Sequence, residues 1–404
     1  MKTTESYFYD THCHIMDLTQ PNLFVYVNEF KDKMGDEAIK FLLSPEYIID
    51  RGNKHAVEKI ANLLNVMSQS QSKIIQVLEE DLEGKYITSQ KVKPVIERKR
   101  IKIRNFKFDK FCLTPLIMDF NVPYHNYENL YYKIPQNKDV KYYAETFYYH
   151  LKEFYKNNPD SKIELYPLLG INAPTYNKKE IEGYLNTYFS KFKPVKRSSK
   201  KVSRSSLFAG IKLYPPLGFD PWPKDKKERE KAELIYQFAN DKKIPITTHC
   251  DDGGYRIMEA EMAWKYTSPD RYAEVLKKYP DLKINFAHLG QQYYRSYGLF
   301  KNNDWRIKIF KLMLEYPNVY SDFSFSIILK NYFKMILHEI GEFNEADQKI
   351  ISDRLMYGSD FNINLNKIDS YTDYLRIFEN SILTDEQIFK FSNINPEKFL
   401  FENR

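Results

Sequence analysis

Eight short apolar segments, most of them separated by a stretch with helical spacing, constrain the fold of this 404-residue chain more than any other feature. Strands that alternate with helices pair in parallel through right-handed crossovers. Eight such units predict an α/β fold, the (β/α)8 TIM barrel, in which functional groups lie at the carboxyl ends of the strands. The predicted strands span residues 7–14, 110–120, 162–171, 207–218, 243–250, 282–290, 318–325 and 354–361.

The barrel accounts for residues 1–17 and 110–404, which leaves residues 18–109 as a long insertion after the first strand. Connections inside such barrels usually have only a few residues. Within the insertion, residues 55–84 have apolar positions at helical spacing, and residues 91–108 alternate apolar and basic side chains like a hairpin or an edge strand. Because the insertion leaves the carboxyl end of the first strand, we predict a lid or cap over the active site; an oligomer contact is the alternative.

Composition is that of a globular protein of a reducing compartment. Hydrophobic residues make up 43% and charged residues 28%, which is typical of a folded domain. Three cysteines are too few for a disulfide framework, and we find neither a leader peptide nor an apolar run of membrane-spanning length, so we expect a cytoplasmic protein. Seven lysines and arginines fall in residues 191–206, before the fourth strand. We expect this run to be a solvated loop on the face opposite the active site, and not a nucleic-acid surface.

Two histidines, His12 and His14, flank Cys13 at the end of the first predicted strand. On a strand, side chains two positions apart point the same way, so the imidazoles converge and Cys13 turns away to pack behind the strand. Convergent neutral imidazoles are ligands that Zn²⁺ accepts. A bare H-x-H also occurs in loops that bind no metal, so the pattern requires further ligands from elsewhere in the chain.

Polar residues at later strands supply such ligands. Lys212 lies in the fourth strand, His249 ends the fifth, His288 ends the sixth and Asp360 ends the eighth. Each has an ordinary alternative: a hydrogen-bonded turn histidine, an exposed lysine, or a helix N-cap for Asp360. Lys212 alternates with aliphatic neighbours that pack against the helices, which aims it into the barrel mouth. A lysine buried there is costly unless its charge is neutralised or paired.

Together with the H-x-H pair, the stretches GIKLYPPLGFDP, FAHLGQQ and LMYGSDFN resemble the metal-dependent amidohydrolase superfamily, in its amidohydrolase-2, or amidohydrolase-related, branch. The resemblance covers residues 5–17 and 110–400, and the insertion has no counterpart in it. The ordered pattern H-x-H, K, H, H, D is specific, whereas any single element of it is weak.

The resemblance implies a ligand set for one or two divalent ions, with Zn²⁺ as the expected ion. His12, His14 and Asp360 would bind the first ion. Lys212 matches the lysine that, in binuclear members, is carboxylated and bridges two ions held also by the fifth- and sixth-strand histidines, His249 and His288. In mononuclear members, His249 joins the first set and His288 serves the substrate or the water. The sequence leaves both arrangements open.

The reaction implied by the resemblance is hydrolysis of an amide, ester or lactone bond by a metal-activated water. Asp360 would accept the proton of that water and pass it to the leaving group. His288, or His249 if it is not a ligand, would stabilise the developing oxyanion. The catalytic residues expected are therefore Asp360, His288 and, as the bridge, Lys212.

The main alternative is a metal-dependent, non-oxidative decarboxylase of an aromatic or unsaturated carboxylic acid, a reaction found in the same branch. Tyr214, Arg256, Asp251 and Asp252 would then line the pocket, with Arg256 pairing the substrate carboxylate. A metal-dependent DNase is disfavoured because those enzymes carry glutamate at the position of Lys212. A non-catalytic binding protein is disfavoured because every expected ligand is present. We expect a small-molecule substrate, neither nucleic acid nor membrane as a partner, and leave a homodimer open.

Overall fold

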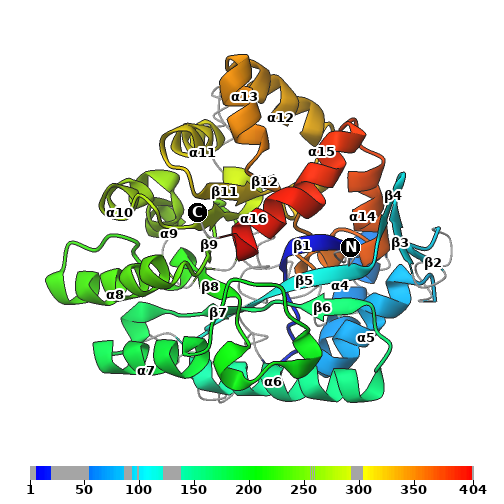
Figure 1. Cartoon of the computed structure of the whole chain (residues 1–404), viewed down its shortest axis with the longest axis horizontal. Coiled ribbons are helices and arrows are strands. Elements are labelled where there is room, and N and C mark those ends of the chain that lie inside the picture. Colours follow the sequence, from blue (N-terminus) through cyan, green and yellow to red (C-terminus); the bar gives the residue numbers. More distant parts are fainter. Residues whose placement is uncertain are drawn as a thin grey trace, which may run out of the picture.

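A parallel sheet of nine strands closes almost completely into a barrel in the computed structural model (Figure 1). The structure describes residues 6–19, 54–85, 93–97, 100–121, 138–254, 256, 258, 260–292 and 304–402. The strands are β1 (Tyr7–Cys13), β5 (Lys110–Ile117), β6 (Ile163–Leu165), β7 (Leu168–Gly170), β8 (Gly210–Leu213), β9 (Ile246–Thr248), β10 (Ile284–Phe286), β11 (Val319–Asp322) and β12 (Leu355–Met356). The order β1-β5-β7-β8-β9-β10-β11-β12 follows the chain, which confirms the predicted TIM barrel.

The third position of the barrel is shared by two short strands. β6 pairs with the first half of β5 and β7 with the second half. Pro167 lies between them and has no N–H to donate to a ladder, so the strand breaks there.

The barrel closes between its first and last strands through single hydrogen bonds. Thr11 N donates to Tyr357 O at 3.0 Å, and Asp360 N donates to His12 O at 2.7 Å. These bonds bring the residues that follow β12 against the end of β1. The H-x-H pair and Asp360 therefore lie at the same edge of the sheet.

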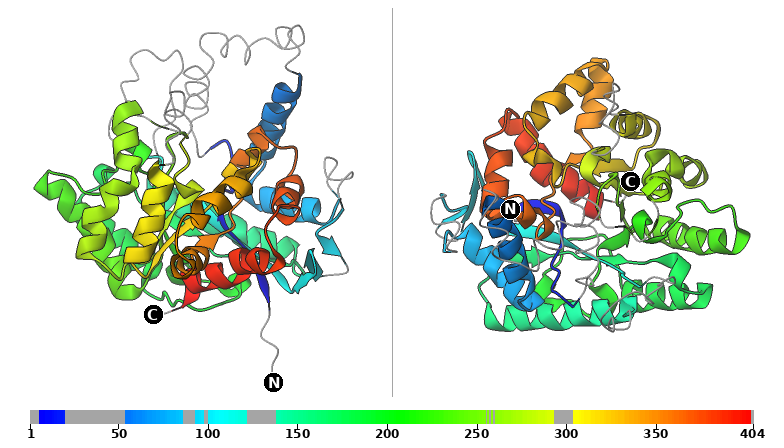
Figure 2. Two further views of the ribbon diagram at one scale, coloured as in Figure 1. Left: turned by 90° about the horizontal axis from the view of Figure 1, so that it is seen from above. Right: turned by 180° about the vertical axis from the view of Figure 1, so that it is seen from behind.

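Helices surround the sheet on its outer side, as two further views show (Figure 2). They are α6 (Val140–Asn157), α7 (Lys178–Phe189), α8 (Lys226–Lys242), α9 (Ala260–Thr267), α10 (Ala273–Lys278), α11 (Asp304–Glu315), α12 (Tyr332–Gly341), α13 (Glu345–Ser352), α14 (Tyr371–Glu379), α15 (Asp385–Phe389) and α16 (Asn395–Phe401). Side-chain caps start several of them; α7, for example, begins with a capping box of Asn177 and Glu180. No helix within the described ranges is long and apolar enough to cross a membrane.

Helix α16 lies against the amino ends of the strands. Its Phe399 and Leu400 belong to a buried cluster with aromatic side chains from the barrel interior, including Tyr7, Tyr9 and Tyr166. The basic run at residues 191–206 lies at this end as well, since Lys196 Nζ contacts Glu397 of α16 at 2.6 Å. This placement agrees with the expectation that the run and the strand-end histidines occupy opposite faces.

The described part of the insertion supplies a member of the outer helical ring. It comprises α4 (Lys54–Met67), α5 (Gln71–Leu82) and an antiparallel sheet of β2 (Ile96–Glu97), β3 (Arg100–Ile103) and β4 (Phe106–Phe108). Helix α5 packs between α6 and α14. Asp81 accepts from Thr372 N of α14 at 2.7 Å, and Glu79 accepts from Lys162 N at 2.8 Å. Within the stretch at 91–108, the described residues 96–97, 100–103 and 106–108 form antiparallel strands, as the alternating pattern predicts.

Helix α4 lies beside the loop that follows β12. Lys59 Nζ donates to Lys367 O at 2.7 Å, and Asn62 Nδ2 donates to Asp369 O at 2.9 Å. In the left view of Figure 2, α4 (blue) and α16 (red) lie toward opposite ends of the molecule. Residues 20–53 lie outside the described residues, and the role of the insertion as a lid or cap stays a prediction.

Candidate metal centre

The two histidines of the first strand converge on one carboxylate oxygen. His12 Nε2 lies 3.3 Å and His14 Nε2 lies 3.2 Å from Oδ1 of Asp360. All three side chains are buried. The register of β1 against β5 shifts between Asp10 and Cys13, and Cys13 packs in the core on the other side, as predicted. The structure thus brings together His12, His14 and Asp360.

A second carboxylate, Asp10, holds the loop that carries Asp360. It accepts from Ser359 N at 2.9 Å, from Ser359 Oγ at 2.5 Å and from the Tyr371 hydroxyl at 2.8 Å. Burial raises the pKa of Asp10 to about 6, against the opposing effect of these hydrogen bonds. Asp10 was not among the expected site residues; a carboxylate within an apolar strand, two positions before His12, is the signal that could have pointed to it.

The fifth and sixth strands bring His249 and His288 together with Asp251. His249 Nε2 lies 3.2 Å from Asp251 Oδ1, and His288 Nε2 lies 3.6 Å from Asp251 Oδ2. Burial alone would raise the pKa of Asp251, but the two imidazoles lower it to about 2. Burial lowers the pKa of His288 to about 4, so this ring is neutral near pH 7.

Among the residues that the structure describes, two sets of three have ligand atoms that all lie within 4.8 Å of one another. One set is His12, His288 and Asp360, and the other is His249, Asp251 and His288. Both sets are fully buried and combine imidazole nitrogens with a carboxylate, which suits Zn²⁺ and related divalent ions. His288 belongs to both sets.

Asp322, at the end of β11, lies behind the first set. Its Oδ2 is 3.1 Å from His12 Nδ1 and accepts from Asn285 Nδ2 at 2.6 Å, while Oδ1 accepts from Ser324 Oγ at 2.5 Å. Burial would lower the pKa of His12, but Asp322 outweighs it and raises that pKa to about 9. Sequence reasoning missed Asp322, although it ends the seventh strand just as Asp360 ends the eighth.

Lys212 of β8 is buried, with 1% of its surface exposed. Its Nζ has no hydrogen-bond partner within the described part of the chain. Burial lowers the pKa of Lys212 to about 8, and the carboxylates of Asp322, Asp360 and Asp251 act in the opposite direction. The lysine therefore lies among the strand-end carboxylates, as its alternation with Ile211 and Leu213 predicts.

Tyr214 and Arg256 were the residues predicted to contact substrate. The Tyr214 ring packs on the His249 imidazole with centroids 4.5 Å apart, and it lies 5.6 Å from Lys212 Nζ. Arg256 is partly exposed in the segment after Asp251. Contact of either residue with a substrate stays a prediction.

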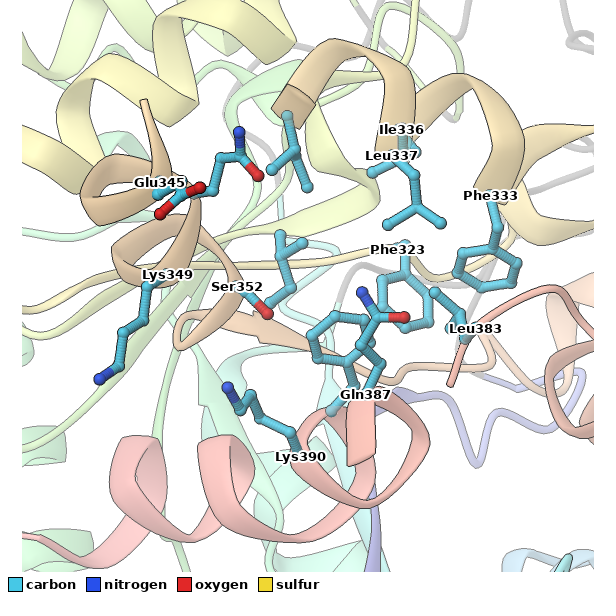
Figure 3. Close-up of a pocket in the computed structure, with 14 residues that line it drawn as sticks. Phe323, Phe333, Ile336, Leu337, Glu345, Lys349, Ser352, Leu383, Gln387 and Lys390 are labelled. Atoms are coloured by element: carbon cyan, nitrogen blue, oxygen red, sulfur yellow. The ribbon is translucent and has the colours of Figure 1, made fainter. Parts of the chain in front are cut away.

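A cavity of about 310 Å³ lies elsewhere, between α12, α13 and α15 (Figure 3). Phe323, Phe333 and Ile336 contribute to its apolar wall, and Lys349 and Lys390 to its polar side. None of the strand-end histidines lines it. The cavity is therefore separate from the candidate metal centre.

Comparison with known proteins identifies a family through sequence. The amidohydrolase family model matches residues 196–401, just over half of the 404 residues. This stretch contains Lys212, His249, His288 and Asp360. No match was found among curated proteins.

Several solved structures match the chain at low sequence identity. A 4-oxalomesaconate hydratase from Rhodopseudomonas palustris is 13% identical, with a TM-score of 0.46 over 97% of this chain and 95% of that chain. A mutant PTE-like lactonase from Deinococcus radiodurans is 10% identical, with a TM-score of 0.44 over 98% and 96% of the two chains. A 2,6-dihydroxybenzoate decarboxylase from Rhizobium is 10% identical, with a TM-score of 0.38 over 72% and 83%. Likeness at this level does not identify a reaction.

Proposed function

Because the chain belongs to the amidohydrolase family, we propose that it is a metal-dependent hydrolase that cleaves an amide, ester or lactone bond of a small molecule by a metal-activated water. The observation that carries the proposal is the convergence of His12 and His14 on Asp360. The three side chains come from the first and last strand ends and are buried together.

The residues fit a divalent ion. His12 Nε2 is buried and has no hydrogen-bond partner among the described residues, although it faces the Asp360 carboxylate. A buried polar atom in this state is costly unless a further group satisfies it. His12, His14 and Asp360 would hold the ion, which when bound supplies Lewis acidity and lowers the pKa of water toward neutrality.

Four side chains around this position have roles in the proposal. His12 and His14 hold the pKa of Asp360 well below its usual range despite its burial, so this carboxylate is ionised near pH 7. In the proposal Asp360 is the group that accepts the proton of the attacking water. His288, neutral near pH 7, can either bind a second ion or, where no second ion is bound, hydrogen-bond to the oxygen of the bond that is cleaved.

The experiment that tests the proposal combines metal counting with turnover. Protein purified without chelator is analysed for bound metal and assayed on a panel of amides, esters and lactones. The His12→Ala, His14→Ala double variant should lose both metal and turnover, whereas His338→Ala, which removes an exposed histidine of α12, should lose neither. Absence of bound metal in the wild type would overturn the proposal. Release of CO₂ from carboxylic acids, without hydrolysis, would replace it with the decarboxylase reaction.

A further inference from the structure

We propose that His249, Asp251 and His288 form a second divalent-cation position in which Asp251 supplies the carboxylate, so that the second ion binds without carboxylation of Lys212. The inference rests on the proposed function, since it concerns the same strand-end centre. It assigns a ligand role to Asp251 and makes the second ion independent of CO₂.

The two oxygens of the Asp251 carboxylate each lie near one histidine nitrogen, at separations close to those between ligands of one ion. Ligands that bind Zn²⁺ at about 2.0–2.2 Å in a tetrahedron lie roughly 3.4 Å from one another. Asp251 Oδ1 is 3.2 Å from His249 Nε2, and Asp251 Oδ2 is 3.6 Å from His288 Nε2. His249 Nε2 is also buried without a hydrogen-bond partner in the part of the chain that the structure describes. A cation at this point would satisfy it.

The loop after β9 holds Asp251 in this place. Gly253 N donates to Asp251 Oδ1 at 2.6 Å. Gly254 has φ +77°, and a Cβ there would come within 2.8 Å of the Tyr214 hydroxyl and 3.1 Å of His249 Nε2. Glycine lets the loop fold back over the imidazole, which brings the carboxylate against both histidines.

A single nitrogen of His288 can bind the ion of only one of the two sets. Its Nδ1 lies 3.0 Å from Ser324 Oγ, which leaves Nε2 as the ligand atom. Nε2 lies 3.2 Å from His249 Nδ1 and 3.6 Å from Asp251 Oδ2. We therefore assign His288 to the second position, and the first keeps His12, His14 and Asp360.

Lys212 is not needed to complete this second set. The three residues already offer two nitrogens and a carboxylate, the number of protein ligands typical of a Zn²⁺ site with an open position. Carboxylation of Lys212 would add a carboxylate ligand to a set in which Asp251 already supplies one. The deciding question is therefore whether binding of the second ion requires Lys212 or Asp251.

The test is a Zn²⁺ titration of chelator-stripped protein, with and without bicarbonate, in which bound ions per chain are counted after gel filtration. The wild type should bind two ions in both buffers. Asp251→Asn should lose the second ion, its affinity falling by more than the roughly 10- to 100-fold typical of an outer-shell change. Lys212→Met and the matched control Asp252→Asn should keep two ions. The His12→Ala, His14→Ala variant should keep one.

Asparagine retains a carbonyl oxygen for the Gly253 N–H, so loss of the ion in Asp251→Asn would not reflect collapse of the loop, and Asp251→Ala with a thermal unfolding control checks this. Two ions in Asp251→Asn, or a second wild-type ion that needs bicarbonate and disappears in Lys212→Met, would overturn the inference. If the variants bind ions in the predicted pattern but the wild type hydrolyses no panel compound, the proposed function is wrong and the role of Asp251 as a ligand still holds. A wild type that binds no ion overturns both.

Discussion

The carboxylate of Asp322 lies 3.1 Å from Nδ1 of His12, while Nε2 of the same ring lies 3.3 Å from Asp360. One imidazole therefore lies between the carboxylate that ends β11 and the carboxylate in the loop that follows β12. A carboxylate behind a ligating histidine fixes the tautomer and the orientation of the ring and raises its basicity. Asp322 has this position relative to His12, and Asn285 and Ser324 hold it in turn.

Asp322→Asn should weaken metal binding by about 10- to 100-fold. The amide has only one acceptor oxygen and no charge, so it holds the His12 ring in place less firmly than the carboxylate does. Competition with a chromophoric chelator measures the change. Asp353→Asn, which removes a surface carboxylate paired with Lys390, is the matched control and should bind as the wild type does. Equal affinity in both variants would show that Asp322 does not position His12.

Asp360→Asn should leave the protein folded and lower kcat by about 10²- to 10⁴-fold, the range associated with loss of a general base. The amide occupies the same volume, so the backbone hydrogen bonds to His12 O persist. Steady-state kinetics on the substrate found in the panel, with thermal unfolding of the same sample, separates lost chemistry from lost fold. Wild-type turnover in this variant would remove Asp360 from the mechanism.

Asp119→Asn should change how stability depends on pH. Asp119 follows β5 and accepts from Asn172 N at 2.9 Å, and burial raises its pKa from 3.8 to about 7. In the unfolded chain Asp119 loses its proton at a lower pH than in the folded protein. The free energy of unfolding of the wild type therefore falls as pH rises from about 4 to 7, by an amount of the order of 3–4 kcal/mol at most.

The asparagine variant has no such proton, so its stability relative to the wild type should increase between pH 5 and pH 8. Urea unfolding at the two pH values measures the difference. Parallel pH profiles for the two proteins would contradict the raised pKa of Asp119.

Arg306→Ala should destabilise the fold by roughly 3–5 kcal/mol, because it removes the buried guanidinium that pairs with Glu339 and leaves its volume unfilled. The Arg306 side chain is 1% exposed, and its Nε lies 2.8 Å from Glu339 Oε2 between α11 and α12. The Arg306→Met, Glu339→Leu double variant should recover most of that loss, since buried pairs are often replaced by apolar side chains at little cost. Additive losses in a double-mutant cycle would argue against a buried pair.

The positions of the barrel strands can be predicted from the sequence because each is an apolar run bounded by turn residues. The predicted strands are longer than the observed ones. The run at 207–218 contains a strand only at Gly210–Leu213, since a 3-10 turn begins at Pro215. The run at 282–290 ends as a strand at Phe286, because His288 and Leu289 adopt positive φ. Spacing and strand order bring His12, His14 and Asp360 together, and the structure agrees.

Asp322 and Asp10 could not be assigned from spacing alone. Their partners, His12 and Ser359, lie more than 300 positions away, so their roles follow only from the closed barrel. The place of α5 was missed for the same reason. Its amphipathic pattern predicts a helix, but contacts with α6 and α14 decide that it belongs to the outer ring.

The hydrogen bond between Thr11 and Tyr357 joins residues 346 positions apart. During synthesis the first strand emerges early, while the strand that completes the barrel and the aspartate after it emerge near the end. A chain stopped before β12 would carry the two histidines without Asp360, and would hold a cation no more firmly than an isolated histidine pair. If the proposed function holds, tight binding of the first ion therefore requires a completed barrel, and the protein gains its activity only when the last strand is in place.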